Sequence, residues 1–389
     1  MGLDGVRGLA ILLVMAIHFV GDATPHSTLE RAVVKAAGYG LLGVDLFFVL
    51  SGFLITGLLL EARGEAGYFQ NFYARRTLRI FPLYYFVLGV LFVVLPRLTT
   101  PSSLLETARE HQVWLWTYTS NFYLAKTSSW ASLSYVSHFW SLSIEEHFYL
   151  LWPMLVAWCE PRMLERVCVG AIVGAVLLRL VLTAAGVSEL SISVLTPCRL
   201  DTLSTGALLA LLARRGDDWR TQLVESSGRW VLLLGAVIVV LSGFGVVTRL
   251  WLPALHQIRG TLFALFFGAM TLTSLQPVTR FWGRVFASRT LRFFGKYSYG
   301  LYVYHGLFTW LLIDLQADQR LEAWLGSPRL VLIARAVLGT SCSVLVAVCS
   351  YELFEKRFLA LKRYFAGPDQ PILGVAEPTG LTTPPARTQ

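Results

Sequence analysis

The sequence predicts an all-α, polytopic membrane protein with about ten transmembrane helices and both termini in the cytoplasm. Hydrophobic residues make up 55% of the 389-residue chain and charged residues only 15%, whereas soluble domains hold about 25% charged residues. The mean hydropathy is +0.59. Apolar stretches of about 20 residues, the length that crosses a hydrocarbon core, recur along the whole chain.

These apolar stretches define the predicted spans, whose boundaries are soft by several residues. The spans are residues 7–22, 39–60, 80–96, 138–158, 166–185, 198–213, 230–247, 257–275, 293–315 and 329–352. Because the connections are short and no internal repeat is visible, residues 1–366 are expected to form one transmembrane domain. The tail, residues 367–389, is rich in Pro, Thr and Gly and is expected to be a disordered cytoplasmic segment.

Lysine and arginine gather in alternate connections, and this asymmetry sets the predicted orientation. The basic connections hold more than twice as many Lys and Arg residues as the connections between them. The positive-inside rule places the basic connections, and with them both termini, in the cytoplasm, as an even number of spans requires. Topology therefore accounts for the net charge of +9, and no nucleic-acid partner is expected.

Cysteine spacing and the aromatic residues limit the kinds of site that the chain can contain. The 5 cysteines have no paired spacing, and the sequence has no H-x-x-x-H, C-x-x-C or G-x-S-x-G element. No disulfide framework, metal site or covalent serine enzyme is therefore expected. The outer connection 97–137 is dense in Trp and Tyr, which is typical of an interfacial belt, the favoured interpretation, or of a stacking surface for a sugar-like acceptor. Residues 355–365 predict a basic helix on the inner leaflet.

The first span carries three ionisable residues, Asp4, Arg7 and His18, among apolar ones. A helix turns about 100° per residue, so Arg7 and His18 lie within about 20° of one line and about 16 Å apart along the axis, with Asp4 within about 40° of that line. Ionisable groups at membrane depth usually face a cavity or a partner. The alternative is that Asp4 pairs with Arg7 at the membrane edge and that His18 only hydrogen-bonds a neighbouring helix.

Four other spans place polar residues at a depth similar to that of His18. They are Asp45, then Glu145 with Glu146, then Arg199 with Asp201, and finally Tyr302 with His305. A carboxylate beside a histidine selects its tautomer and stabilises the imidazolium that forms in general-base catalysis. His18 with Asp45 or Glu145 is therefore the predicted catalytic pair. The alternative is a set of interhelical hydrogen bonds, each worth about 1 kcal/mol.

Three arginines, Arg75, Arg76 and Arg79, precede the third span at its cytoplasmic end. Forked guanidinium groups bind phosphate through parallel hydrogen bonds. Their position, opposite a buried histidine, predicts an anionic cytoplasmic ligand whose reactive end enters the membrane. A phosphorylated carrier with a long thin arm, such as coenzyme A, has this shape. The alternative is a plain positive-inside anchor.

Four motifs together resemble the acyltransferase 3 family of integral-membrane acyltransferases, over about residues 3–358. The motifs are LDGVRGLAILLVMAIH, GVDLFFVLSGFLIT, FYARRTLRIFPLYY and FWSLSIEEHFYLLWP, with weaker matches at RLDTLSTG, GKYSYGLYVYH and FEKRF. Two positions depart from the family pattern: Arg357 stands where Pro is usual, and His147 stands where Gln is common. Neither departure touches the predicted base.

The depth comparison and the resemblance together give the candidate site. The catalytic residues are His18, Asp45 and Glu145. The acyl-CoA-binding residues are Arg7, Arg75, Arg76 and Arg79, with neutralisation of a carboxylate as the alternative role of Arg7. The residues expected to bind the acceptor or to support the site are Ser51, Trp140, Ser141, Arg199, Asp201, Tyr302 and His305.

The resemblance also implies a reaction. An acyl group, acetyl being the first expectation, would pass from cytoplasmic acyl-CoA to a hydroxyl of a surface glycan, a peptidoglycan sugar or a macrolide, in the bacterial cytoplasmic membrane. His18 would remove the proton of that hydroxyl, and a two-step route through an acyl-histidine is the variant. Many larger family members append an extracytoplasmic esterase-like domain, whereas transfer by this chain is expected to be completed within the membrane domain.

A proton-coupled transporter, using the same histidine and carboxylates as a relay, is the alternative from another class. Transporters usually contain inverted repeats and helices broken near the membrane midplane, but the sequence has no visible repeat. The arginine cluster also has no role in a transporter. A non-catalytic scaffold would leave the buried charges unexplained.

Overall fold

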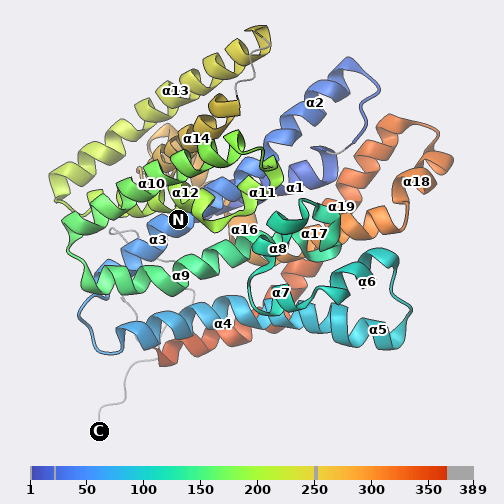
Figure 1. Ribbon diagram of the computed structural model, residues 1–389, viewed down its shortest axis with the longest axis horizontal. Helices are drawn as coiled ribbons and strands as arrows, with labels where there is room; N and C mark the ends of the chain where they lie inside the picture. The colour runs from blue at the N-terminus through green and yellow to red at the C-terminus, as the bar shows by residue number, and fades with distance from the viewer. Residues whose placement is uncertain (1, 22, 249–252, 366–389) are drawn as a thin grey trace.

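The computed structural model of the chain describes residues 2–21, 23–248 and 253–365, with the side chains of 243–248 and 253–256 left aside. Within these ranges the chain is helical and has no strand, which confirms the predicted all-α class (Figure 1). The predicted disordered tail, residues 367–389, lies outside the described residues.

Long helices alternate with short helical connections along the chain. The α-helices are α1 (Gly2–Ala16), α2 (Thr28–Gly38), α3 (Leu42–Glu61), α4 (Tyr68–Gly89), α5 (Leu95–Leu98), α6 (Ser103–Glu110), α7 (Val113–Trp116), α8 (Ser120–Thr127), α9 (Trp140–Trp158), α10 (Pro161–Ala184), α11 (Glu189–Val194), α12 (Thr196–Leu212), α13 (Asp217–Thr248), α14 (Pro253–Thr273), α15 (Phe281–Phe286), α16 (Arg289–Lys296), α17 (Ser298–Asp314), α18 (Ala317–Leu325), α19 (Pro328–Ser350) and α20 (Lys356–Ala360). The π turns are η1 (Ile17–Gly21), η3 (Val90–Val94) and η6 (Tyr351–Glu355), and the 3-10 turns are η2 (Tyr39–Leu41), η4 (Trp130–Ser132), η5 (Ser134–Phe139) and η7 (Leu361–Tyr364).

A helix lies at each of the predicted spans. Among the described residues, 6 helical segments are long and apolar enough to cross a membrane: Gly2–Gly21, Thr28–Glu61, Tyr68–Leu98, Pro161–Ala184, Asp217–Ser242 and Pro328–Tyr364. The helices α12 and α17 have 17 residues each, which is at the short end of what a membrane span needs. The structure therefore confirms a polytopic helical protein.

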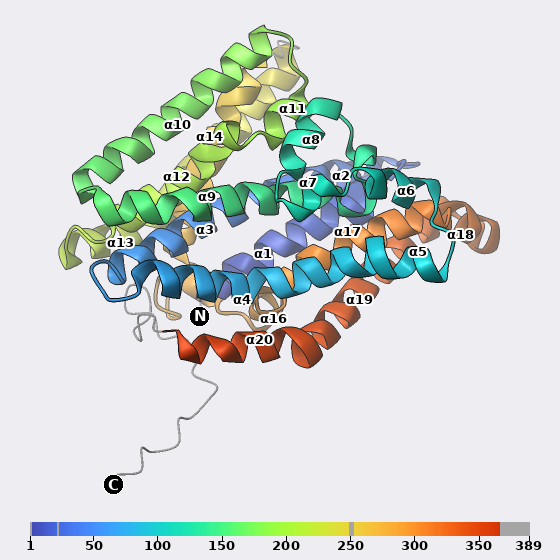
Figure 2. The same ribbon diagram turned by 60° about the horizontal axis from the view of Figure 1, so that its bottom comes forward.

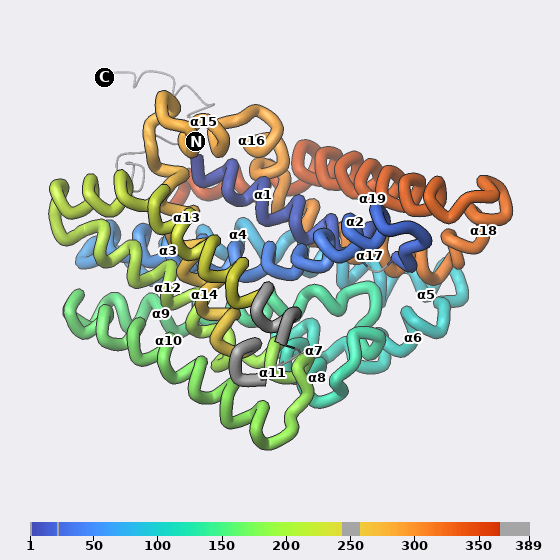
Figure 3. Tube along the Cα trace, turned by 90° about the horizontal axis from the view of Figure 1, so that it is seen from above, coloured from blue at the N-terminus to red at the C-terminus, as the bar shows by residue number. Residues whose placement is uncertain are grey.

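The bundle is built around α1 and α3, which lie between two groups of helices. Figures 1 and 3 show α10, α12, α13 and α14 on one side and α17, α18 and α19 on the other. Helix α1 packs against α3, α16 and α17, and α3 packs closely on α12. At that contact, Gly52 of α3 faces the backbone of Leu203, and Gly206 of α12 faces the backbone of Val49. Small residues of this kind let membrane helices approach each other closely.

The aromatic connection 97–137 folds back on the bundle instead of extending from it. It forms the short helices α6, α7 and α8. The ring of Trp116 stacks on Tyr85 of α4, with centroids 5.7 Å apart, and Trp114 stacks on Tyr123 at 5.7 Å. These rings therefore pack against other aromatic side chains of the protein.

The end of the described chain returns along α4. Helix α19 continues through the π turn η6 into α20, which runs beside α4 (Figure 2). The predicted helix over 355–365 is thus partly confirmed, because α20 ends at Ala360 and a 3-10 turn follows. Nη1 of Arg75 donates a 3.2 Å hydrogen bond to the carbonyl of Phe365, which ties this end of the chain to α4.

The candidate active site

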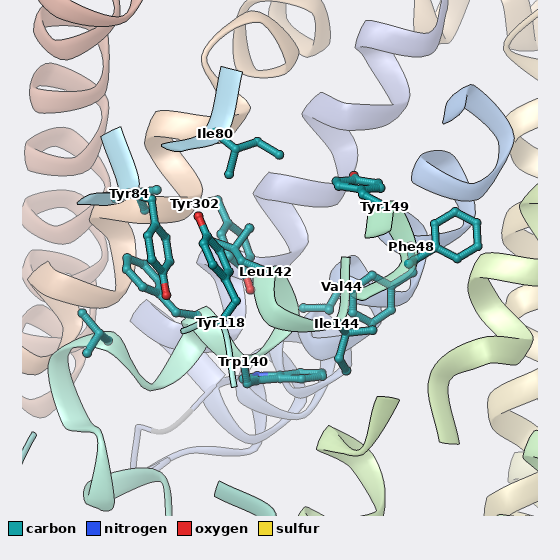
Figure 4. Packing of buried hydrophobic residues seen from close by; sticks show 14 of the residues in the cluster. Val44, Phe48, Ile80, Tyr84, Tyr118, Trp140, Leu142, Ile144, Tyr149 and Tyr302 are labelled. Atoms are coloured by element: carbon teal, nitrogen blue, oxygen red, sulfur yellow. The ribbon is translucent and has the colours of Figure 1, made fainter. Parts of the chain in front are cut away.

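One cavity is lined by half of the predicted site residues. Its empty volume, including its open mouth, is about 800 Å³. The predicted residues that line it come from α1, α3, α4, α9 and α17, and they are Arg7, Ser51, Arg76, Arg79, Ser141, Glu145 and Tyr302. Apolar side chains complete its wall; Figure 4 shows four of them, Val44, Phe48, Ile80 and Leu142, together with Tyr149 and Tyr302. Residues far apart in the sequence thus meet at one place, and Glu145 and Tyr302 are the two of them that the depth comparison had grouped.

Arginine side chains form one part of this wall. Arg7 pairs with Asp4 across one helical turn, with Nη1 3.0 Å from Oδ1, so the predicted alternative pair is present while Arg7 also faces the cavity. Neither Arg76 nor Arg79 makes a hydrogen bond or an ion pair with any residue of the described part of the chain. The guanidinium of Arg76 lies 5.9 Å from the ring centroid of Tyr149. Two cationic groups without a carboxylate partner favour an anionic ligand.

Arg75 does not face the cavity with its two neighbours. It lines an adjoining cavity of about 450 Å³, in whose wall Arg76 also takes part. Arg75 and Arg79 are four positions apart and would share a helix face, but the Arg75 side chain is drawn to the carbonyl of Phe365 at the end of the described chain. The predicted arginine cluster is therefore divided between two adjacent cavities.

Glu145 is held from the neighbouring helix. Ser51 Oγ of α3 donates a 2.6 Å hydrogen bond to Glu145 Oε1 of α9. The same hydroxyl lies 3.2 Å from Oη of Tyr149, one turn further along α9. The carboxylate is thus part of a small polar group in the cavity wall.

Asp45 is paired with an arginine. Nη1 of Arg199, in α12, lies 2.7 Å from Asp45 Oδ1, and the same guanidinium lies 5.7 Å from the ring centroid of Trp140. We expected Asp45 or Glu145 to orient His18, and the structure gives these carboxylates Arg199 and Ser51 as partners instead. The reason is the close packing of α3 on α12, which brings a cation to Asp45, and an opposite charge at this distance in a low dielectric attracts the carboxylate more strongly than a neutral imidazole does.

Asp201 lies one layer further from the cavity. Its Oδ2 is 2.9 Å from Nη2 of Arg179, and both side chains are buried. Thr261 Oγ1 donates a 2.6 Å hydrogen bond to the same oxygen. Arg179, Arg199 and Asp201 share a separate cavity of about 460 Å³. The predicted supporting residues Arg199 and Asp201 therefore line this separate cavity and not the cavity that holds Glu145.

His18 occupies a π turn at the end of the first helix. Its Nδ1 lies 2.8 Å from the carbonyl oxygen of Val14. A carbonyl only accepts, so Nδ1 carries the proton and Nε2 is the basic nitrogen. The ring meets His305 of α17 edge-on, with centroids 4.7 Å apart. The predicted neighbours His18 and His305 are thus in contact.

A third histidine, His138, belongs to the same cluster and was missed by the sequence analysis. Its ring centroid is 4.9 Å from that of His305. Nε2 of His138 lies 3.1 Å from the carbonyl of Val303, and Nδ1 of His305 lies 3.1 Å from the carbonyl of Leu301. The remaining nitrogen of each ring is buried and has no hydrogen-bond partner among the described residues. The clue was an ionisable residue directly before the FWSLSIEE motif.

Tyr302 joins the histidine cluster to the cavity. Its hydroxyl donates a 2.9 Å hydrogen bond to the carbonyl of His138 and makes a short hydrogen bond with Ser141 Oγ. Tyr302 and Ser141 both line the cavity, whereas His18 is not among the described residues of its wall. Of the residues predicted to meet by their depth, Glu145 and Tyr302 line the cavity and His18 and His305 form the histidine cluster, whereas Asp45, Arg199 and Asp201 lie outside both.

Two further residues of the site region were not predicted. Tyr149 follows Glu145 by four residues and therefore shares its face of α9, which was the available clue. Arg179 stands inside an apolar span, where an arginine needs a partner, and Asp201 is that partner.

The 3-10 turn η5, which carries His138, is tied to the end of α17. Tyr135 donates a 2.6 Å hydrogen bond to Asp314 Oδ2 at the end of α17. Burial, with this hydrogen bond to Asp314, raises the pKa of Tyr135 well above its usual value. The phenol therefore remains a donor at neutral pH, and it ties the segment before His138 to the helix that carries His305.

Comparison with known proteins now bears on this site. Peptidoglycan O-acetyltransferase OatA of Listeria monocytogenes is 25% identical over 371 residues, which are 91% of this chain and 54% of that protein. YrhL of Bacillus subtilis is 29% identical over 372 residues, 91% of this chain and 54% of its own length. O-acetyltransferase OatA of Staphylococcus aureus is 25% identical over 319 residues, 78% of this chain and 49% of that protein.

The chain spans about half the length of these curated relatives. No solved structure matches it. The sequence model of the acyltransferase domain family matches residues 2–352, which is nearly the whole transmembrane region. The resemblance carried by the four motifs is therefore confirmed, and the chain belongs to the acyltransferase 3 family.

Proposed function

We propose that this protein is a membrane O-acetyltransferase that moves an acetyl group from cytoplasmic acetyl-CoA to a hydroxyl of a carbohydrate acceptor. The observation that carries the proposal is a single cavity. Arg76 and Arg79, which have no hydrogen-bond or ion-pair partner among the described residues, face the same space as Ser141, Glu145 and Tyr302. An anionic carrier and a reacting group can therefore occupy one site.

The proposed topology has ten spans with both termini in the cytoplasm of a bacterial cell. It is supported by a helix at every predicted span and by the basic connections at one end of the bundle. Helix α4 begins at that end, so Arg76 and Arg79 would be reached from the cytoplasm. The side of entry matters because acetyl-CoA is a cytoplasmic metabolite.

We propose that Arg7, Arg76 and Arg79 hold the phosphates of acetyl-CoA, while Arg75 supports the nucleotide end from the adjoining cavity. Guanidinium groups bind phosphate oxygens through charge-assisted hydrogen bonds in pairs. The pantetheine arm would follow the apolar wall formed by Val44, Phe48 and Ile80 and bring the thioester toward Ser141 and Tyr302.

The proposed chemistry is direct transfer with His18 as general base. Nε2 of His18 takes the proton from the acceptor hydroxyl, and the alkoxide oxygen bonds to the thioester carbonyl carbon. In the tetrahedral intermediate the Ser141 hydroxyl would turn its proton from Tyr302 Oη to the oxyanion, while Tyr302 continues to donate to the carbonyl of His138. When the carbon–sulfur bond breaks, the CoA thiolate takes the proton back from His18. Glu145 keeps the cavity wall in place through Ser51, and Asp45 orders Arg199 beside Trp140.

The acceptor we favour is a peptidoglycan sugar, since the Listeria monocytogenes relative is named as a peptidoglycan O-acetyltransferase. Surface polysaccharides and macrolides are the other hydroxylated acceptors. Histidines beside a cavity are also compatible with a proton-coupled transporter, which would have no use for Arg76 and Arg79.

The experiment that tests the proposal follows labelled acetyl-CoA. The purified full chain is reconstituted in lipid, and release of free CoA and transfer of radiolabelled acetate to peptidoglycan fragments are compared between wild type and His18→Ala. Turnover that disappears in the variant, with acetyl-CoA binding retained, supports both the donor and the base. A folded wild-type protein that neither binds nor consumes acetyl-CoA would falsify the donor assignment, and proton flux measurements would then test the transporter.

A further inference from the structure

Helix α19 has one buried face, and an arginine lies on it. The buried residues of α19 recur every four positions, and they are Val331, Arg335, Gly339, Ser343 and Ala347. The Arg335 side chain is only 9% exposed. A buried guanidinium in a transmembrane helix is costly unless it is paired, and such residues usually mark function.

Arg335 contacts the backbone of the proposed base. Its Nη2 donates a 3.3 Å hydrogen bond to the carbonyl oxygen of His18, and its Nη1 lies 3.0 Å from Oδ2 of Asp318 in α18. The segment Gly2–Gly21 ends three residues after His18, and carbonyls in the last turn of a helix commonly lack an intrahelical donor. Arg335 supplies that donor from another helix, and Asp318 holds the guanidinium in place.

A second contact reinforces the first one turn further along α19. A side chain at Gly339 would collide with the ring of Phe19, which is fully buried. Residues 335 and 339 share one face of α19 because they are four positions apart. Helix α19 thus contacts the carbonyl of His18 through Arg335 and the ring of Phe19 through Gly339. Both residues lie in the π turn Ile17–Gly21, and π turns often mark functional sites.

The imidazole of His18 depends on this backbone for its direction. Its Nδ1 bonds the carbonyl of Val14 and its ring meets His305, so a shift of the π turn would move Nε2 relative to the acceptor. We propose that Arg335, braced by Asp318, is a positioning residue that holds the His18 base in its reactive orientation. This inference rests on the proposed function of His18.

The test replaces the guanidinium without breaking the fold. Arg335→Met has a similar length and removes a buried charge, and the Asp318 side chain it leaves behind is 52% exposed and stays solvated. We expect kcat for acetyl transfer to fall by about 10- to 100-fold, because small displacements of a catalytic group have effects of this size. The KM for acetyl-CoA should stay within about twofold, because Arg76 and Arg79 are untouched. Arg335→Lys replaces the forked guanidinium by a single ammonium group, so its kcat should lie between those of Arg335→Met and wild type.

Arg329→Met is the matched control. Arg329 lies on the same helix and pairs with Glu30, with Nε 3.2 Å from Oε1, but its side chain is 63% exposed. This variant should keep wild-type kcat. Gly339→Ala, which presses on Phe19, should lower kcat in the same way as Arg335→Met. If Arg335→Met does not fold, Asp318→Asn and Gly339→Ala decide the matter, since neither removes the buried arginine.

A spectroscopic readout separates this inference from the proposed function. In protein labelled with ¹⁵N-histidine, the His18 signals, assigned with His18→Gln, should show one tautomer with the proton on Nδ1. Arg335→Met should add a second tautomer or broaden these signals, and Arg329→Met should leave them unchanged. Unchanged His18 signals or wild-type kcat in Arg335→Met would overturn the positioning role. The expected spectral change in a chain that never consumes acetyl-CoA would instead remove the proposed function and keep the positioning role.

Discussion

Ser51 Oγ and Glu145 Oε1 lie 2.6 Å apart and join α3 to α9 across the cavity. The two residues come from separate sequence motifs, 94 positions apart. Because the hydroxyl also lies 3.2 Å from Oη of Tyr149, the carboxylate anchors a polar group of three side chains. This geometry assigns Glu145 to the wall of the cavity, next to Ser141 and away from the partnership with His18 that we had expected.

A pair of variants at Glu145 separates its charge from its hydrogen bond. Glu145→Gln keeps an oxygen that accepts from Ser51, so kcat should fall by less than about tenfold. Glu145→Ala leaves the hydroxyl of Ser51 without its acceptor, and kcat should fall by about 100-fold, since unsatisfied buried polar groups are costly and the wall rearranges. Steady-state kinetics of acetyl transfer measures both. If Glu145→Gln is as inactive as Glu145→Ala, the carboxylate charge itself takes part in the reaction.

The two arginines without partners should control the affinity for the donor. Arg76→Gln and Arg79→Gln should each raise the KM for acetyl-CoA by about 10- to 100-fold, since a hydrogen bond to a charged group contributes about 1.5–3 kcal/mol. The kcat should change little, because the thioester lies away from the phosphates. Lysine substitutions should recover part of the affinity, as they restore charge without the fork.

Arg97→Gln is the control for these donor variants. Arg97 lies in α5, at the opposite end of the segment Tyr68–Leu98, and it is exposed. Its loss should leave the KM for acetyl-CoA unchanged. An equal rise of KM in Arg97→Gln and Arg76→Gln would mean that general surface charge attracts the donor, and the cavity would lose its assignment.

Part of the site could be predicted from depth along the helices. Polar residues at similar depths in separate spans were expected to meet, and Glu145 and Tyr302 do line one cavity, while Arg7 and Ser51 of the same wall followed from the motifs. The helical class and a helix at each predicted position followed from apolar length alone, because few other structures tolerate so many apolar residues.

The partners of each residue could not be predicted, because depth says nothing about rotation around the bundle. Asp45 pairs with Arg199 because α3 packs on α12. Neither of the two motifs contains a residue pattern that predicts this pairing. The contact of Arg75 with the carbonyl of Phe365, from the far end of the described chain, could not be predicted either. The π turn that carries His18 was also hidden, since its sequence, IHFVG, reads as an ordinary apolar helix.

The buried pair of Arg179 and Asp201 should matter for stability. Their side chains are 7% and 1% exposed. Asp201→Ala leaves the guanidinium buried without its countercharge and should lower the free energy of unfolding by about 3–5 kcal/mol. Combining Arg179→Met with Asp201→Leu should recover most of that loss, because it removes both charges. Thermal unfolding in lipid nanodiscs measures the stability of wild type, Asp201→Ala and the double variant.

The control for this pair is an ion pair nearer the surface. Arg215 pairs with Glu165, and the Arg215 side chain is half exposed. Arg215→Gln should change the free energy of unfolding by less than about 1 kcal/mol. A double variant that is no more stable than Asp201→Ala would contradict the electrostatic explanation and point to packing around Arg179.

The close contact between α3 and α12 also ties the fold to the site. A Cβ at Gly52 would collide with the carbonyl oxygen of Leu203, and a Cβ at Gly206 would collide with that of Val49. These neighbours are backbone atoms, so they cannot rotate away as a side chain can. A larger residue at either position must therefore push α3 from α12, the two helices that carry Asp45 and Arg199.

Gly52→Ala should consequently destabilise the protein and weaken the site together. Overpacking of this kind costs about 1–3 kcal/mol, more than the gain of about 1 kcal/mol that alanine brings to a helix interior. Gly174→Ala in α10 is the matched control, because no atom of another element lies within 4 Å of its added Cβ, so it should leave stability equal or slightly higher. Thermal unfolding and kcat are measured for both variants. If Gly52→Ala behaves like Gly174→Ala, the two helices do not approach each other through their glycines, and the contact that brings Arg199 to Asp45 must have another origin.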